Sequence, residues 1–157
     1  YNDAWINFEN FTAVEDETIA ETIRKIKPIM DPNLILFAYT AEGEPVSFVM
    51  ILPDTNELIY NLNGKLDLLG KIKFLWNKIT VKHKRMRCVI MGTKQKYQNH
   101  GLESCLFMKL QEYSHGLGHY EELELSWVGD FNDKMMALHE SIGATFAKRH
   151  ITFHCIF

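Results

Sequence analysis

Residues 92–104 read GTKQKYQNHGLES, and this stretch decides the fold. The apolar run before it, residues 86–92, predicts a buried strand, and the spaced apolar residues after it predict a helix over residues 101–117. Gly101 therefore falls where the helix begins. The first N–H groups of a helix lack partners within the helix and carry partial positive charge, so such a turn can bind a phosphate group. The alternative interpretation is an ordinary loop between a strand and a helix. Three side chains of the loop would favour an anion: Lys94, Lys96 and His100.

The elements on either side of this stretch are predicted from hydrophobic spacing and turn residues. Helices are expected at 16–30, 55–62, 65–79 and 132–142, and strands at 34–40, 46–52, 122–128 and 145–157. The first two strands flank Gly43 and read as an antiparallel hairpin. Strands 86–92 and 122–128 are joined by a helix, which favours parallel pairing. The predicted fold class is α/β, with a mixed sheet flanked by helices.

Length and composition limit the class of protein. The chain has 157 residues, of which 46% are hydrophobic and 24% charged, which suits one globular domain, 1–157, and excludes a disordered chain. The apolar runs are too short to span a bilayer, so no membrane partner is expected. The chain does not begin with Met, and we expect it to be a fragment or a trimmed chain. Three widely spaced cysteines, Cys88, Cys105 and Cys155, predict free thiols and a cytoplasmic location.

No metal site is predicted from the histidines. His115 and His119 are four residues apart, a spacing that can place two ligands on one helix face. Gly116 and Gly118 interrupt the helix at that point, and no third ligand is evident. The expectation is therefore that the protein uses no metal.

Charge is spread unevenly along the chain. Residues 65–87 carry eight Lys or Arg side chains and one acidic residue, Asp67, whereas the whole chain has a net charge of −3. This basic block would attract an anionic ligand, line a nucleic-acid surface, or form the solvated face of an amphipathic helix. The third interpretation is favoured by apolar residues at helical spacing within the block. A nucleic-acid partner is not expected, because the chain is acidic overall and aromatic residues do not interleave the block.

A second stretch, residues 132–144, reads NDKMMALHESIGA and follows an alternating strand. Together the two stretches resemble the GNAT superfamily of acetyl-coenzyme A-dependent N-acyltransferases. The main superfamily motif, Arg/Gln-x-x-Gly-x-Gly/Ala, falls on residues 98–103, and the last motif, Asn-x-x-x-x-x-Leu/Tyr-x-x-x-Gly-Phe/Ala, falls on residues 132–144. The order of the motifs, Glu124-Leu-Ser-Trp-Val and the terminal strand are similar to an uncharacterised bacterial branch, in which this stretch is the C-terminal part of a longer chain.

The resemblance implies a GNAT-like sheet whose parallel strands 86–92 and 123–128 splay apart to hold acetyl-coenzyme A or another acyl-coenzyme A. It implies that residues 90–92 contact the pantetheine arm and that residues 98–103 hold the pyrophosphate. Two positions depart from the motif: Asn99 stands where Gly is usual, and Glu103 replaces a small residue in the first turn. The cofactor-binding residues implied are Ile90, Met91, Gly92, Lys94, Lys96, Gln98, Asn99, His100, Gly101, Leu102, Glu103 and Asn132.

Amine acylation needs a deprotonated amine, a stabilised oxyanion and a proton for the leaving thiolate. By the resemblance, His139 occupies the position of a Tyr that donates to the thiolate in many superfamily members. The alternative is a histidine on the helix surface. Glu124 and Tyr97, with Ser126, are further candidates for a base or a water relay. Strand 86–92 offers no carboxylate.

The implied activity is direct transfer of an acyl group to an amine, carried by a small molecule or a peptide. A different possibility is a catalytically inactive GNAT-like scaffold, which the carboxylate at position 103 favours. The aromatic residues of the leader either cover this domain's own sheet or pack on a second copy or an N-terminal partner domain. These residues are Tyr1, Trp5, Phe8 and Phe11.

Overall fold

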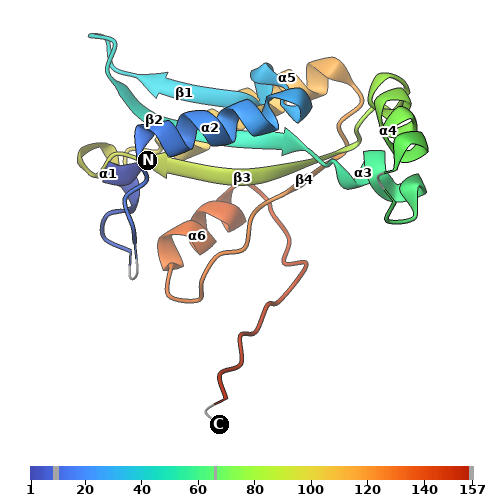
Figure 1. Ribbon diagram of the computed structural model, residues 1–157. Helices are drawn as coiled ribbons and strands as arrows, with labels where there is room; N and C mark the ends of the chain where they lie inside the picture. The colour runs from blue at the N-terminus through green and yellow to red at the C-terminus, as the bar shows by residue number, and fades with distance from the viewer. Residues whose placement is uncertain (9–10, 66, 156–157) are drawn as a thin grey trace.

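The computed structural model describes residues 1–8, 11–65 and 67–155, which form a four-stranded sheet flanked by helices (Figure 1). Strands β1 (Ile35–Tyr39), β2 (Pro45–Pro53), β3 (Arg85–Thr93) and β4 (Glu122–Glu124) lie in that order across the sheet. β1, β2 and β3 are antiparallel neighbours, whereas β4 runs parallel to β3. The mixed sheet confirms the predicted fold class, since a hairpin joins β1 to β2 and a helix crosses between β3 and β4.

The helices lie close to their predicted positions. Within the described residues they are α1 (Asn2–Trp5), α2 (Asp16–Ile26), α3 (Asn56–Ile59), α4 (Leu68–Thr80), α5 (Leu102–Leu117) and α6 (Asp133–Ser141). Two predicted helices end in a 3-10 turn: α2 continues as Lys27–Ile29, and α3 continues as Tyr60–Leu62. The helix predicted at 65–79 begins at Leu68, and Leu66 lies outside the described residues.

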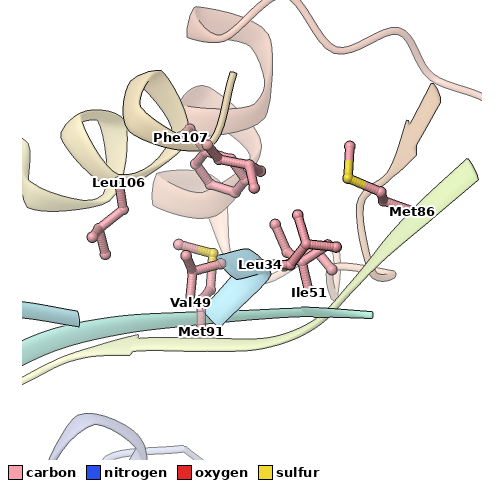
Figure 2. Packing of buried hydrophobic residues seen from close by; sticks show 9 residues of the cluster. Leu34, Val49, Ile51, Met86, Met91, Leu106 and Phe107 are labelled. Carbon is pink, nitrogen blue, oxygen red and sulfur yellow. The ribbon is translucent and has the colours of Figure 1, made fainter. Parts of the chain in front are cut away.

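The main core lies between α5 and one face of the sheet (Figure 2). Leu106 and Phe107 of α5 point toward the sheet, where Val49 of β2 and Met91 of β3 face them. Side chains alternate along a strand, so a buried Met91 places Gly92 on the opposite face. The other fully or nearly fully buried members of this cluster are Leu34, Ile51, Met86, Cys88 and Leu110.

Two strand predictions differ from the structure at the C-terminal end. β4 is only three residues long, whereas a strand was expected over 122–128. Residues 144–155 form no strand, and residues 156–157 lie outside the described residues. A strand needs a neighbour for its backbone groups, and this segment leaves the sheet instead of pairing with β4 (Figure 1). Phe146 and Phe153 are consequently exposed, by 73% and 87%.

The basic block divides into two parts. Arg85 and Arg87 of β3 form ion pairs, at 3.0 Å each, with Glu122 and Glu124 at the paired positions of β4. These cross-strand pairs hold the two parallel strands in register. The lysines of α4 lie apart from the sheet, at one end of the molecule (Figure 1).

Candidate functional site

The two parallel strands stay together only at their beginning. Backbone pairing ends at Arg87 and Glu124. Beyond that point the hydroxyl of Ser126 donates to the carbonyl oxygen of Cys88, and the chain after β4 then leaves β3. The divergence that the resemblance implied is therefore present. It leaves backbone groups of β3 on that side without a strand neighbour.

The parting strands open a cavity of about 710 Å³. Its walls are residues 88–93 of β3, the loop before α5 with the first turn of that helix, the segment after β4, α6, and the N-terminal segment. This volume lies within the range of small-molecule and cofactor sites. Many of the lining side chains are apolar, with polar groups concentrated near the start of α5 and on α6.

A β-bulge interrupts β3 where it borders the cavity. Met50 of β2 pairs with Ile90 and Ile51 pairs with Cys88, so Val89 is an extra residue without a partner across β2. Bulges commonly re-aim backbone groups next to functional sites. Val89 is 45% exposed and lines the cavity. The sequence gives no signal for this bulge, because an inserted strand residue does not change the composition of the strand.

Two residues of the loop before α5 adopt left-handed backbone conformations. Asn99 adopts φ 63° and Gly101, the N-cap of α5, adopts φ 74°. Asn tolerates this left-handed region better than most residues, so it can stand where Gly is usual. The side chain of Gln98 donates to the Thr93 carbonyl at 3.2 Å, and a ring nitrogen of His100 lies 2.8 Å from the Gln98 carbonyl. The loop is thus held with the first N–H groups of α5 beside the cavity.

Glu103 lies in the first turn of α5 and lines the cavity. Its side chain is half-buried. In the part of the chain that the structure describes, its carboxylate accepts no hydrogen bond from the amides at the start of the helix. The carboxylate therefore leaves those amides open while adding negative charge to the same end of the cavity.

Helix α6 brings the last motif to the opposite wall. The Asn132 side chain accepts a hydrogen bond from the Met135 N–H at 3.2 Å and so caps the helix, as its position predicts. His139 follows on the same helix, half-buried and lining the cavity. Burial lowers the pKa of His139 below its ordinary value of 6.5. The imidazole is therefore neutral near pH 7 and can accept a proton.

The structure places Tyr97 outside the cavity lining. Its hydroxyl donates to the Glu44 carboxylate at 3.3 Å, and Lys94 pairs with the same carboxylate at 2.7 Å. The hydrogen bond from Lys94 lowers the pKa of Glu44, and the pKa of Lys94 is raised in return. Lys96 lies 5.3 Å from the Tyr97 ring centre. These residues tie the loop to the β1–β2 hairpin.

Glu124 also lies outside the cavity lining. Its carboxylate pairs with Arg87 at 3.0 Å and with Lys148 at 3.1 Å. The hydrogen bond from Arg87, followed by that from Lys148, lowers the pKa of Glu124. A carboxylate held in this way is a weaker base, and the structure does not bring it to His139.

The site residues expected from the sequence therefore separate into two groups. Those that the structure brings together in the cavity wall are Ile90, Met91, Gly92, Gln98, Asn99, Gly101, Glu103, Asn132 and His139. Those that it places outside the wall are Lys94, Lys96, Tyr97, His100, Leu102 and Glu124.

The N-terminal segment forms a wall that sequence reasoning did not assign to the site. The indole nitrogen of Trp5 donates to the Met91 carbonyl at 3.2 Å, and the Phe8 ring packs at a tilt against Trp5 with ring centres 4.9 Å apart. Both side chains line the cavity. Trp5 therefore lies against this domain's own sheet, as one of the alternatives for the leader expects. Trp127 and Phe131 add apolar wall from the segment after β4.

A cysteine nucleophile and a metal centre have less support in the described residues. Burial raises the pKa of the Cys88 thiol to about 12, so it is not a nucleophile near neutral pH. Among the described residues, no group of three or more His, Cys, Asp and Glu side chains is arranged to hold a metal. No helix in the described part of the chain combines the length and apolar character needed to cross a bilayer.

Comparison with known proteins gives two curated relatives. No protein-family profile matches the chain. Over 153 residues it is 31% identical to the bacterial ceramide synthase of Caulobacter vibrioides, and over 153 residues it is 27% identical to Protein YghO of Escherichia coli. The matches cover 95% and 96% of this chain but only 39% of each relative. The chain thus corresponds to well under half the length of these proteins.

Solved structures with a similar fold include aminoglycoside N-acetyltransferases. AAC(6')-Iy in complex with a coenzyme A bisubstrate analogue has a TM-score of 0.56 at 13% identity, over 99% of this chain and 86% of that chain. AAC(6')-Ih from Acinetobacter baumannii has a TM-score of 0.57 at 14% identity, over 92% of this chain and 83% of that chain. At such low identity these likenesses establish the fold alone.

Proposed function

Because the chain has the GNAT fold, we propose that it binds an acyl-coenzyme A and transfers the acyl group directly to an amine. The observation that carries this proposal is the cavity between β3 and the segment after β4, whose lining includes both the start of α5 and His139. One site thus offers amides for a phosphate, a strand edge for an amide-containing arm, and a titratable group.

The cofactor is proposed to lie along β3 with its pyrophosphate at the start of α5. The pantetheine arm contains amides that can pair with backbone groups of residues 89–92, where β3 has no strand neighbour on the cavity side, except for the Met91 carbonyl, which accepts from Trp5. The anionic pyrophosphate suits the positive end of a helix. Lys134, which lines the cavity, is a cation near this route that the sequence reasoning did not select. Lys94 is less suited, because it is paired with Glu44.

The proposed reaction uses His139 as a proton carrier. The free amine attacks the thioester carbonyl, and the nitrogen of the tetrahedral intermediate then bears one proton too many. Neutral His139 accepts that proton and passes it to the sulfur as the carbon–sulfur bond breaks, giving the amide and the thiol of coenzyme A. Backbone N–H groups near the Val89 bulge would stabilise the oxyanion. Cys88 remains a neutral thiol and is not proposed to carry the acyl group.

The acceptor class is suggested by the relative that is named a ceramide synthase. A ceramide is the amide of a fatty acid with a long-chain amino alcohol, so its synthesis is the acylation of an amine. We therefore propose a long-chain amino alcohol as acceptor and a fatty acyl group as donor. The aromatic walls of the cavity suit alkyl chains: Trp5, Phe8, Trp127 and Phe131.

One observation favours the second candidate, an inactive GNAT-like scaffold. The Glu103 carboxylate stands at the end of the cavity where the pyrophosphate is proposed to lie. Negative charge there weakens binding of an anionic cofactor. A scaffold would retain the fold and the cavity without turnover.

Mass spectrometry of the products decides between the two candidates. The chain is incubated with palmitoyl-coenzyme A or acetyl-coenzyme A and with sphinganine, spermidine or an amine-bearing peptide. We expect the palmitoyl amide of sphinganine, formed with release of free coenzyme A. Amide formed only on spermidine or the peptide would support the transferase activity but reject a long-chain amino alcohol as the acceptor. No amide with any pair, although calorimetry detects coenzyme A binding, would favour the scaffold.

A further inference from the structure

Helix α4 turns its apolar side chains away from the domain. The side that faces the domain consists of the buried Gly70, the half-buried Phe74, and Asn77, whose side-chain amide donates to the Leu58 carbonyl at 2.8 Å. The opposite side, called here the outer face of α4, exposes each of six large apolar side chains by 58–83%. These are Leu68, Leu69, Ile72, Leu75, Trp76 and Ile79.

This orientation is the reverse of an ordinary surface helix, which buries its apolar side and exposes its polar side. The periodicity of the stretch is as the sequence predicts, but the six side chains lie on the side of α4 opposite its contact with the domain. Tyr60, just before this helix in the chain, is 84% exposed as well. A contiguous apolar surface with this exposure marks an interaction site.

Lysines border the outer face of α4. At 100° per residue, Lys71 and Lys78 fall on one margin of that face and Lys73 on the other. In the described residues, neither Lys71 nor Lys78 forms an ion pair. Asp67, the acidic residue that precedes α4 in the sequence, caps the helix: its carboxylate accepts a hydrogen bond from the Gly70 N–H at 2.8 Å. The margins therefore carry uncompensated positive charge on a chain whose net charge is −3.

We propose that α4 docks this domain on the surface of an anionic lipid bilayer. An apolar face that includes Trp and is bordered by Lys is the pattern of a helix lying in the plane of a membrane interface. The lysine stems can extend along the apolar surface while their ammonium groups reach the headgroup phosphates. A second copy of this chain would be repelled, since the same lysines would meet across a symmetric contact. This proposal departs from the expectation, drawn from the sequence, of no membrane partner.

The position of α4 is compatible with such docking. It lies beside the end of the sheet where β3 begins, whereas β3 ends near α1 and the loop that leads into α5 (Figure 1). Docking through the outer face would leave the start of α5 directed away from the bilayer. The inference rests on α4 alone and holds whether or not the domain transfers acyl groups.

Vesicle flotation tests this proposal with the 157-residue chain. Vesicles of phosphatidylcholine alone are compared with vesicles that also contain phosphatidylglycerol. We expect binding to the mixed vesicles that is stronger by about tenfold and weakens as salt is raised. The double variant Leu69→Glu/Ile79→Glu should lose at least about tenfold in binding, because two charges replace inserted side chains. Both positions are more than three-quarters exposed, so the fold should remain, as circular dichroism would verify.

Two further variants make the result specific to α4. Met108→Glu changes a side chain on α5 that is 69% exposed, and should leave binding unchanged. Lys71→Glu/Lys78→Glu should abolish the preference for phosphatidylglycerol. Absence of binding to both kinds of vesicle would overturn the proposal. In that case light scattering would show whether a second copy covers the face, as a dimer that Leu69→Glu/Ile79→Glu dissociates. A monomer would also leave membrane docking rejected.

Discussion

The indole nitrogen of Trp5 donates a hydrogen bond to the carbonyl oxygen of Met91, 86 residues further along the chain. Met91 contributes its side chain to the core under α5, while its backbone borders the cavity. The bond therefore fixes the N-terminal segment against β3 at the wall of the candidate site. It also occupies a carbonyl group that a pantetheine amide could otherwise use.

Trp5→Phe should destabilise the protein. The change removes the indole donor while keeping an aromatic ring, so the free energy of unfolding should fall by about 1 kcal/mol, as for one partly buried hydrogen bond. Urea denaturation followed by circular dichroism measures the change. Trp127→Phe is the matched control, since Trp127 is 79% exposed and should shift stability by less than about 0.5 kcal/mol. Equal effects of the two substitutions would mean that the Trp5–Met91 bond contributes nothing to folding.

Gly92→Ala should separate α1 from β3. A Cβ atom at this position would lie 2.9 Å from the Ala4 Cβ and 3.3 Å from the Trp5 indole nitrogen, closer than side chains tolerate. The expected cost is about 1–3 kcal/mol of unfolding free energy, with faster proteolysis of the N-terminal segment.

The control for this substitution is Gly116→Ala in α5, where no heavy atom lies within 4 Å of the added Cβ. That change should be neutral or stabilising by up to about 1 kcal/mol, because Ala favours a helix over Gly. A Gly92→Ala protein as stable as the Gly116→Ala protein would contradict the packing described for α1.

Glu103→Gln should tighten binding of coenzyme A. A like-charge contact between Glu103 and the pyrophosphate at about 5 Å would cost about 3 kcal/mol at an effective dielectric near 20. Solvent screening at this half-buried side chain lowers the cost, so we expect the substitution to raise the affinity about tenfold. Isothermal titration calorimetry measures it. Glu112→Gln on the same helix is the control, because Glu112 pairs with Lys109 on the surface at 2.6 Å. Unchanged affinity in Glu103→Gln would place the pyrophosphate elsewhere.

His139→Gln should lower kcat by about a hundredfold while leaving the KM for the acyl-coenzyme A nearly unchanged, since the proton carrier is lost and the binding amides remain. His115→Gln, on the exposed side of α5, is the control. Equal kcat values for wild type and His139→Gln would remove His139 from the reaction.

The same residue predicts how stability depends on pH. Burial makes the folded-state pKa of His139 lower than its unfolded value near 6.5, so the unfolded chain binds more protons between the two pKa values. The contribution of His139 to the free energy of unfolding is therefore fully present above the unfolded-state pKa. It is lost as the pH falls through the lower, folded-state pKa. Urea denaturation as a function of pH should show a shallower acid slope in His139→Gln than in wild type.

The sequence predicted the helices and strands that surround the site, because short local patterns mark where they begin. The Gly101 turn, the Asn132 cap and the alternation after residue 121 are each readable within a few residues, and together they indicate the order of elements. The divergence of the two parallel strands was implied by the resemblance and not by these local signals.

What the sequence could not provide depends on distant contacts. Trp5 reaches the site only through a bond to a residue 86 positions away, and the pairing of Glu124 with Arg87 depends on the register of two strands. The final strand was wrong for residues 145–155, because strand propensity does not supply a neighbouring strand to pair with. For α4, periodicity shows an apolar stripe but not which side of the helix meets the domain.

The central claim is that an acyl-coenzyme A lies in the cavity where β3 and β4 part. Nuclear magnetic resonance of the labelled chain, titrated with coenzyme A, tests it at the level of single amides. We predict that the amide signals of residues 89–92 and 98–103 move with a common dissociation constant, while those of α4 stay in place. Signals of both segments that remain fixed up to millimolar coenzyme A would contradict the account.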